Sequence, residues 1–397
     1  MKKILVICDF YLPSVNSGGG MWTVANIIDR FSNRFEFFVL TRNYDSPGDT
    51  TPYTSVETDA WNNVGNARVY YASTQNLTKK GIAVIVNEVR PDCIFLNSVF
   101  GTTVVKFLLA RRRGMVADIP IVLASTGNLG TGGMATRRLK KKLFLAYAKI
   151  IGLYRGVIWK SSTKHEVAEA RLVFGNDIVT MIAPDLTPTS LLPEYSFDSK
   201  PKKNPGSARF IFLSRVVPKK NLLFLLKCLV NILHGDVVLD IVGPHEEADY
   251  WSKCLSIIGK LPQNIKVNVL GGVSYLEGLD LLCNSQFFVL PTLNENFGYV
   301  FVESMAAGCP VLTTDQTVWN DMVSKIAGWI IPLSCADDWV DTIRQCIDMD
   351  ADQYAEMSAS ARNFAEEWLR DTRIEDATLN VFNYALNSGA NSAENGG

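Results

Sequence analysis

Asn294-Glu295-Asn296-Phe297-Gly298-Tyr299-Val300-Phe301-Val302-Glu303-Ser304-Met305-Ala306-Ala307-Gly308 follows an apolar run and carries two carboxylates eight positions apart. The run at 286–291 predicts a strand, and the residues from about Gly298 predict a helix. A glycine lets a ligand approach the backbone, and the free N–H groups at a helix start suit an anionic group. This strand–loop–helix unit therefore predicts a ligand site beside Glu295.

The spacing of Glu295 and Glu303 argues against a glycoside hydrolase. Paired carboxyl groups lie about 5 Å apart in retaining hydrolases and roughly 6.5–9.5 Å apart in inverting ones. Eight helical positions separate two backbones by up to ~12 Å. We therefore interpret the two glutamates as contacts to two parts of one long ligand.

The composition is that of an ordinary soluble globular protein. With 397 residues, 47% of them hydrophobic and 20% charged, two domains are expected. The apolar run at 4–8 is too short for a signal peptide, and the chain has no run of the ~20 apolar residues that span a bilayer. Eight scattered cysteines and three histidines suggest neither a zinc site nor a disulfide framework. We expect a cytoplasmic protein.

The charge is unevenly distributed along the chain. Residues 1–190 hold 23 Lys and Arg against 14 Asp and Glu, a net charge of +9, and the remainder holds 16 against 26, a net charge of −10. The basic and acidic halves are expected to have different partners, and no nucleic-acid partner is expected.

Short β-branched and aromatic runs alternate with helix-length segments throughout. Strands this apolar indicate parallel sheets covered on both faces. They are predicted in the first half at 3–8, 35–41, 67–72, 93–97, 119–125, 157–160 and 178–183, and in the second half at 208–213, 237–242, 265–270, 286–291, 310–313 and 328–331. The fold class is therefore α/β, with two Rossmann-like, doubly wound parallel-sheet domains of similar size.

Four prolines, Pro188, Pro193, Pro201 and Pro205, mark a predicted linker at 191–207. It separates an N-terminal domain at 1–190 from a C-terminal domain at 208–369. A helix at about 370–390 is expected to pack back on the N-terminal domain. Ligands of such folds bind at the carboxyl ends of the strands, here expected in a cleft between the two domains.

Arg215 and Lys220 follow the first strand of the C-terminal domain, five residues apart. An Arg fork and a mobile Lys at a strand's carboxyl end suit a diphosphate, although a charged turn is more often merely solvated. In the first domain, the glycines at 18–20 precede an amphipathic helix and can cradle a phosphate or a sugar. Their spacing is not Gly-x-Gly-x-x-Gly, which ranks a dinucleotide oxidoreductase last.

Two further patterns are interpreted as structural. The Asp-x-Asp at Asp348 and Asp350 joins two helical segments, so we interpret it as a helix cap rather than a metal site. His165 lies on a predicted helix and is interpreted as a surface residue.

These motifs together resemble the retaining glycosyltransferases of family 4 (group 1). The resemblance rests on the string from Glu295 to Glu303, the residues 308–311, the Arg215–Lys220 spacing and the glycine loop, and it is strongest over 208–315. It implies a GT-B fold, two Rossmann-like domains facing across a cleft.

The resemblance also implies roles for individual residues. Arg215 and Lys220 would neutralise the diphosphate leaving group without a metal, and Glu295 would face the donor sugar. Glu303 would bind the ribose hydroxyls. The other implied donor contacts are the N–H groups of Asn296, Phe297 and Gly298, the residues Gly271 to Val273 near the base, and Gly19 near the diphosphate.

The chain departs from the family at one point. Many members place a histidine at the end of a first-domain strand, near the donor sugar. The corresponding ends here, at 95–98 and 124–127, have no histidine. Asn97 or Thr126 could hydrogen-bond a sugar hydroxyl instead.

A basic helical segment is expected on the acceptor side. Residues 119–165 hold no acidic residue, and Arg137, Arg138, Lys140, Lys141 and Lys142 precede an apolar run. An amphipathic basic helix could lie on the anionic inner face of a cell membrane, or simply pack on the sheet with a solvated basic rim.

The sequence thus predicts a retaining glycosyltransferase that uses a UDP- or GDP-linked sugar and needs no cofactor. Its expected acceptor is a lipid-linked glycan in cell-surface polysaccharide synthesis, such as O-antigen, capsule or exopolysaccharide. Two alternatives stay open: a nucleotide-sugar epimerase of the same fold, and a non-catalytic subunit of a glycosylation complex.

Overall fold

The computed structural model describes all residues except 15–18, 46–50, 131–133, 135–137, 189–199 and 395–397. The chain divides into two compact units. Unit 1 comprises Met1–Thr189 and Thr372–Gly397, and unit 2 comprises Ser190–Asp371. Among the helices so described, none has the length and apolar character needed to cross a membrane.

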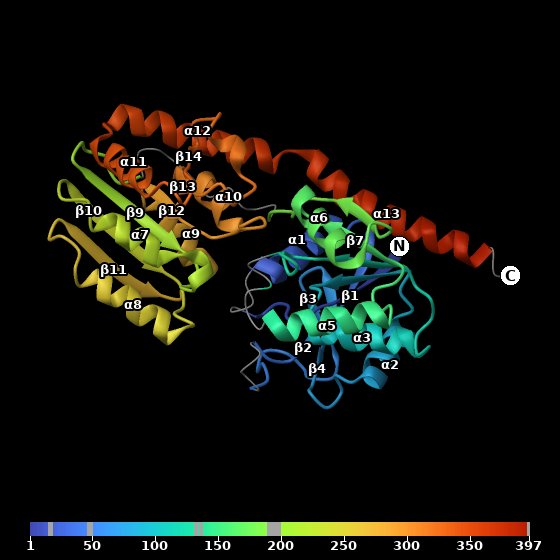
Figure 1. Ribbon diagram of the computed structural model, residues 1–397. Coiled ribbons are helices and arrows are strands. Elements are labelled where there is room, and N and C mark those ends of the chain that lie inside the picture. The colour runs from blue at the N-terminus through green and yellow to red at the C-terminus, as the bar shows by residue number, and fades with distance from the viewer. Residues whose placement is uncertain (15–18, 46–50, 131–133, 135–137, 189–199, 395–397) are drawn as a thin grey trace. The chain divides into compact units, whose positions relative to one another are not determined.

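Unit 1 is built on an eight-stranded sheet with the order β3-β4-β2-β1-β5-β6-β7-β8. Figure 1 labels β1 to β4 and β7 of this sheet. Neighbouring strands are parallel except at one edge, where β3 pairs antiparallel with β4. The strands are β1 (Lys2–Ile7), β2 (Phe35–Arg42), β3 (Trp61–Val64), β4 (Ala67–Ala72), β5 (Cys93–Asn97), β6 (Ile121–Ala124), β7 (Val157–Ser161) and β8 (Val179–Ile182).

Helices cover both faces of this sheet. Residues of α2, α3, α5 and α6 pack in a core on one face, and residues of α1 and α13 pack in a core on the other. In the second core, the ring of Phe382 of α13 packs edge-on or tilted against those of Phe31, Phe35 and Phe95. The helices are α1 (Gly19–Phe31), α2 (Lys79–Val89), α3 (Thr102–Arg112), α5 (Arg138–Ile150), α6 (Lys164–Phe174) and α13 (Thr372–Glu394).

Unit 2 is built on a parallel six-stranded sheet with the order β11-β10-β9-β12-β13-β14. Its strands are β9 (Ser207–Leu213), β10 (Asp236–Val242), β11 (Ile265–Gly271), β12 (Phe287–Leu290), β13 (Val311–Thr313) and β14 (Gly328–Ile330). Its helices are η2 (Pro218–Lys220), α7 (Leu222–Leu229), α8 (Ala248–Ile258), α9 (Tyr275–Cys283), α10 (Tyr299–Ala306), η3 (Asn320–Met322), α11 (Ala336–Asp348) and α12 (Ala351–Leu369).

The predicted fold class is confirmed, because each predicted strand coincides with an observed one to within two residues at either end. One strand, β3, was not predicted. This strand is four residues long and contains Asn62 and Asn63, a residue type that is depleted in strands. Trp61 holds it in place by packing edge-on against Phe38 and Tyr70.

The end of the predicted linker is not a solvated connection. Its residues 189–199 lie outside the described part of the chain, but Lys200 and Lys203 are buried. The ammonium of Lys200 donates to the carbonyls of Leu282 and Ser285, both at 2.9 Å. Lysines that satisfy the free carbonyls at helix ends are a recurrent C-capping device. These two lysines of the predicted linker therefore belong to the core of unit 2.

Lys203 caps α11 in the same way. Its ammonium donates to the carbonyls of Ile347 at 2.9 Å and Met349 at 2.6 Å. Burial lowers the pKa of this ammonium, as it does that of Lys200.

Each sheet has one switch point, where the strand order reverses. It lies between β1 and β5 in unit 1 and between β9 and β12 in unit 2. In doubly wound sheets, ligands bind outside the carboxyl ends of the strands at such points. The residues after β9 and β12, and after β1 and β5, are therefore the candidates for a site.

Candidate functional site

The predicted donor-site residues of unit 2 flank its switch point. Arg215 follows β9, Lys220 ends the short helix η2, and Glu295 lies in the loop between β12 and α10. The backbones of these two segments are joined, because the Lys219 carbonyl accepts hydrogen bonds from Leu293 N at 2.8 Å and from the Thr292 hydroxyl at 3.1 Å. Two segments about 75 residues apart in sequence thus present their side chains at one place.

The loop that carries Glu295 is held on its other side as well. Glu295 N donates to the Gln316 carbonyl at 2.9 Å, and the Trp319 indole donates to the Phe297 carbonyl at 2.6 Å. The Phe297 ring is buried and packs on Trp319 and Trp368, with centroids 5.1 and 5.9 Å away. Phe297 therefore anchors the loop through its side chain, which leaves only its backbone to face a ligand.

Lys220 and Glu295 form an ion pair in which each side chain is 13% exposed. Burial alone would raise the pKa of Glu295, but the positive charges of Lys220, Lys219 and Arg215 outweigh it and lower the pKa below its ordinary value. Glu295 is therefore ionised at neutral pH. It can accept hydrogen bonds and balance positive charge, but it cannot act as a proton donor there.

Gly298, the N-cap of α10, adopts a left-handed conformation with φ of 73°, which favours glycine. A Cβ at this position would lie 2.6 Å from the Phe301 ring and 2.8 Å from Cγ of Glu295. Any larger residue would displace the carboxylate. The predicted helix start is confirmed, since α10 begins at Tyr299.

Glu303 lies one turn into α10, next to the first residue of α9. Burial raises the pKa of its carboxyl to about 7, although a hydrogen bond with Tyr275 opposes the shift. The carboxyl also raises the pKa of the Tyr275 phenol, which burial raises most. A carboxyl that titrates near neutrality changes its hydrogen-bonding capacity with pH, because only the ionised form accepts on both oxygens.

Glycines follow β10 and close β11 at the same edge of the sheet. Gly243 has φ of 139°, and a Cβ on it would lie 2.0 Å from the Ser214 carbonyl after β9. Gly271 accepts a 2.7 Å hydrogen bond from Gly243 N, and no atom lies within 4 Å of a Cβ built on Gly271. The half-buried Val273 follows, one residue before the Ser274 cap of α9. The predicted base-contacting residues thus adjoin the element that carries Tyr275.

Arg215 is held more loosely than Lys220. Its guanidinium donates to Glu246 at 3.2 and 3.3 Å, and the two side chains are 50% and 40% exposed. The sequence analysis did not identify Glu246 as a partner. An exposed pair of this kind contributes little stability, so Arg215 can exchange Glu246 for an anionic ligand at low cost.

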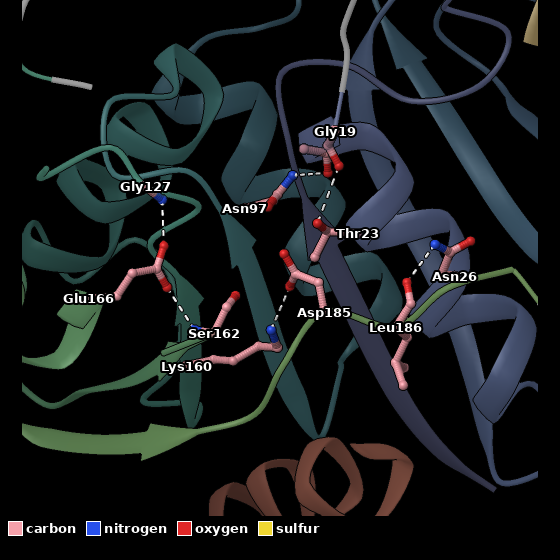
Figure 2. Close-up of polar contacts among 11 residues, drawn as sticks. Gly19, Thr23, Asn26, Asn97, Gly127, Lys160, Ser162, Glu166, Asp185 and Leu186 are labelled. Atoms are coloured by element: carbon pink, nitrogen blue, oxygen red, sulfur yellow. Dashed lines mark hydrogen bonds and ion pairs between the residues drawn. The ribbon is translucent and has the colours of Figure 1, made fainter. Parts of the chain in front are cut away.

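The predicted residues of unit 1 lie around the carboxyl ends of β1, β5 and β6. Figure 2 shows two of them, Gly19 and Asn97. Asn97 at the end of β5 donates to the Gly20 carbonyl at 2.7 Å, and Thr23 donates to the Gly19 carbonyl at 3.2 Å. Asn97 is buried, and Gly19 is exposed at the start of α1. These bonds fix the first turn of α1 against the switch point, while residues 15–18 of the glycine loop lie outside the described part of the chain.

Thr126 follows β6, the strand beside β5. Its φ is 45°, and Ser98 after β5 has φ of 85°. Non-glycine residues rarely adopt this conformation, and they concentrate at functional sites. The two strand ends that lack the expected histidine therefore both have backbone turned away from the strand direction.

Two buried charge centres of unit 1 were missed. The Glu166 carboxylate accepts hydrogen bonds from Gly127 N and Ser162 N, both at 2.6 Å, and so ties together the loops after β6 and β7 (Figure 2). Burial raises its pKa nonetheless. Lys160 at the end of β7 pairs with Asp185 at 2.9 Å. Neither centre has a local signal, because each depends on contacts between separate strand ends.

The predicted basic residues that the structure describes differ in their exposure to solvent. Arg137 lies outside the described residues, and Arg138, Lys140 and Lys142 are exposed on α5. Lys141 is half-buried, with its ammonium 5.1 Å from the centre of the Phe100 ring.

The two patterns interpreted as structural are confirmed. Asp350 caps α12 through a capping box with Gln353, and His165 is 75% exposed beside Glu169. Within the described ranges, no three His, Cys, Asp or Glu side chains gather as they would around a metal ion.

The match to a protein family lies in unit 2. Residues 195–364 match the family model for glycosyl transferases group 1. Among curated relatives, the chain is 30% identical over 110 residues to a D-inositol 3-phosphate glycosyltransferase of Gordonia bronchialis, an alignment that covers 28% of this chain and 24% of that protein.

A second curated relative is the GDP-mannose-dependent monoacylated alpha-(1-6)-phosphatidylinositol monomannoside mannosyltransferase of Corynebacterium glutamicum. It is 27% identical over 165 residues, which cover 39% of this chain and 42% of that protein. The chain thus spans between about a quarter and two fifths of the lengths of these relatives.

The structural likeness extends over the whole chain. A sucrose-phosphate synthase from Thermosynechococcus elongatus matches with a TM-score of 0.73 at 14% identity, covering 98% of this chain and all of that one. HepE of Anabaena, solved in complex with UDP and glucose, matches with a TM-score of 0.71 at 17% identity, covering 97% of this chain and all of that one.

Identities this low show the fold alone, whereas the family match lies in the unit that carries Arg215, Lys220, Glu295 and Glu303. The narrower assignment to family 4 stays a prediction. Residues 195–364 therefore resemble the glycosyl transferases group 1, and the two parallel-sheet domains have the GT-B fold.

Proposed function

We propose that this protein is a retaining glycosyltransferase that moves a sugar from a UDP- or GDP-linked donor to an acceptor. The observation that carries the proposal is the position of the Lys220–Glu295 pair and Arg215 at the switch point of unit 2. The names of its relatives support the donor class, since one is GDP-mannose-dependent and the fold neighbour HepE was solved with UDP and glucose.

The cations supply what departure of a nucleoside diphosphate demands. As the glycosidic bond breaks, negative charge builds on the phosphate oxygens, and positive groups already in place stabilise it without a proton donor. In the proposal, Arg215 leaves the exposed Glu246 for the diphosphate, and Lys220 is oriented toward it by Glu295. These charges make a metal cofactor unnecessary.

The two glutamates contact opposite ends of the donor. Ionised Glu295 accepts hydrogen bonds from sugar hydroxyls, while the backbone N–H groups of Asn296, Phe297 and Gly298 donate to the sugar or the phosphate. Glu303 accepts hydrogen bonds from the ribose hydroxyls, and Gly271 and Val273 lie beside the base. Retention is inferred from the family resemblance, with front-side attack on the departing ion pair.

Unit 1 carries the other residues that the family resemblance assigns to the donor. These are Gly19 for the diphosphate, and Asn97 and Thr126 for the donor sugar in place of the usual histidine. The proposed acceptor is a lipid-linked glycan of cell-surface polysaccharide synthesis, handled at the cytoplasmic face of the membrane.

A panel of nucleotide sugars tests the proposal. A bound donor stabilises the fold by mass action, so the cognate UDP- or GDP-sugar is expected to raise the melting temperature more than its free sugar does. Transfer to lipid-linked saccharides from the source organism is then followed as nucleoside diphosphate release, with and without EDTA. Conversion of the donor with no acceptor present would indicate an epimerase. Stabilisation without turnover would indicate a non-catalytic subunit.

A further inference from the structure

One helix of unit 1 exposes a stripe of large apolar side chains. On α5, Leu139 is 71% exposed, Leu143 63%, Tyr147 55% and Ile150 83%. Their spacing of four, four and three places them along one face of the helix. Single exposed apolar residues are ordinary, but a continuous row of four marks a contact surface.

The stripe is not the face by which α5 packs on the sheet. Leu145 and Ala148 are the buried residues of this helix, and Phe144 is partly buried against the same core. With 3.6 residues per turn, these positions lie on the opposite side from the stripe. The helix therefore has two apolar faces, of which the domain core uses one.

Basic residues border the stripe on both sides. Arg138, Lys142 and Lys149 follow one border and Lys140 lies on the other, and all four are exposed. Past the carboxyl end of α5, the exposed Arg112 approaches Gly152, with 4.0 Å between its Nη1 and the position of a Gly152 Cβ. Residues 119–165 contain no Asp or Glu. An apolar row between two basic borders is the pattern of a helix that lies in a membrane interface.

We propose that α5 docks unit 1 on an anionic lipid bilayer, with Leu139, Leu143, Tyr147 and Ile150 inserted among the acyl chains and the basic borders paired with headgroup phosphates. The charge selects this occupant: a basic surface of this kind attracts anionic lipid, and the apolar row requires a partner with an apolar interior. The inference goes beyond the proposed transferase function and does not depend on it.

Vesicle binding by the full chain tests the proposal. Wild-type protein is expected to co-sediment with vesicles of about 30% phosphatidylglycerol in phosphatidylcholine, to bind pure phosphatidylcholine far less, and to lose binding between roughly 50 and 500 mM NaCl. Replacing Leu139, Leu143 and Ile150 by Ser is expected to lower the partition coefficient at least about tenfold. Because these side chains are exposed, the melting temperature is expected to stay unchanged.

Two matched controls separate this surface from general effects. Leu276→Ser removes an exposed leucine of unit 2 that lies beside Glu277, and it is expected to leave binding unchanged. Replacing Lys227, Lys253 and Lys260 by Ser removes as much charge from unit 2 as replacing Arg138, Lys142 and Lys149 does from α5. Only the α5 variant is expected to weaken binding at low salt.

The depth of the helix gives an independent readout. In the variant Tyr147→Trp, brominated lipids are expected to quench more fluorescence than in the wild type. The proposal is overturned if wild-type protein ignores anionic vesicles, if the serine variant binds as well as the wild type, or if brominated lipids cause no added quenching. Conversion of a dimer into a monomer by the serine changes, with vesicle binding intact, would overturn it in favour of a second copy of the chain.

Discussion

The two units each hold a lysine–carboxylate pair at the carboxyl edge of a parallel sheet, and the two pairs differ in what surrounds them. Lys160 and Asp185 in unit 1 are 2% and 9% exposed and lie at the ends of neighbouring strands near the edge of the sheet. Lys220 and Glu295 in unit 2 are each 13% exposed and lie on loops that flank the switch point. Charge and burial alone would not tell the pairs apart.

The difference lies in the other charges and in position. Glu295 interacts with Lys219 and Arg215 as well as Lys220, and these positive charges outnumber the carboxylates Glu295 and Glu246. The Lys160–Asp185 pair has a further carboxyl group beside it, Glu166, which interacts with both side chains, and it lies away from the switch point of its sheet. We therefore propose a structural role for the pair in unit 1 and a ligand-binding role for the pair in unit 2.

The largest expected effect tests the structural assignment. Lys160→Met leaves the Asp185 carboxylate buried without its partner, which typically costs about 3–5 kcal/mol. Urea denaturation followed by circular dichroism measures the loss. The double variant Lys160→Met, Asp185→Leu removes both charges and is expected to recover most of the stability. Equal destabilisation of the single and double variants would contradict a paired role.

The next largest effect is expected on turnover, and it tests the proposed ligand-binding role of the charges in unit 2. Arg215→Ala removes a half-exposed side chain, so stability is expected to change little. Turnover is expected to fall about 10²–10³-fold, because a charge that stabilises the leaving diphosphate is lost. Steady-state kinetics with the cognate donor measures this. Near-normal turnover in Arg215→Ala would remove this residue from the mechanism.

The raised pKa of Glu303 predicts that the affinity for the donor depends on pH. Its pKa of about 7 in the free protein means that the carboxyl is mostly protonated at pH 6, whereas ribose hydroxyls donate best to the ionised form. Nucleoside diphosphate affinity is therefore expected to be about tenfold weaker at pH 6 than at pH 8. Isothermal titration calorimetry checks this. In Glu303→Gln, affinity is expected to be weaker at pH 8, and the contribution of residue 303 to the pH dependence should disappear.

The raised pKa of Glu303 also predicts that the stability of the unliganded protein falls as pH rises, whereas the affinity for the donor increases. A carboxyl whose pKa is raised on folding binds its proton more tightly in the folded state, so stability falls as pH rises from the unfolded value toward 7. Glu303→Gln is therefore expected to stabilise the unliganded protein by roughly 1 kcal/mol at pH 8 and by little at pH 4. Thermal melts at the two pH values show whether the gain is confined to the higher one.

The smallest effect concerns the exposed pair of unit 2. Glu246→Ala is expected to change stability by no more than about 0.5 kcal/mol, because Arg215 and Glu246 are both well exposed. It also frees Arg215, so nucleoside diphosphate affinity is expected to rise slightly. A large loss of stability would show that this pair is structural, like the one in unit 1.

The sequence predicted those features that depend on residues close together along the chain. Apolar runs located the strands, and residues placed just after a strand, such as Arg215 and Glu295, were predictable as site candidates because strand ends share one edge of a sheet. The helix start at Gly298 followed from its glycine. All of these depend on residues within a few positions of each other.

Features that depend on distant contacts were out of reach. The pairing of Lys160 with Asp185 joins two strand ends, and the environment of Glu303 depends on Tyr275 from another helix. The burial of Lys203 was not predictable, because two of its partners, the carbonyls at the end of α11, lie more than 140 positions away. Hydropathy alone cannot separate a buried, capped lysine from an exposed one.

The division of α12 and α13 between the units has a consequence for synthesis on the ribosome. Unit 2 is continuous in sequence, so it can fold once its own residues have emerged. Unit 1 is not, because Phe382 and Ala385 of α13 fill its core among phenylalanines from the first hundred residues. The amino-terminal half of the chain is made first, yet its core is completed only after the whole of unit 2 has been translated.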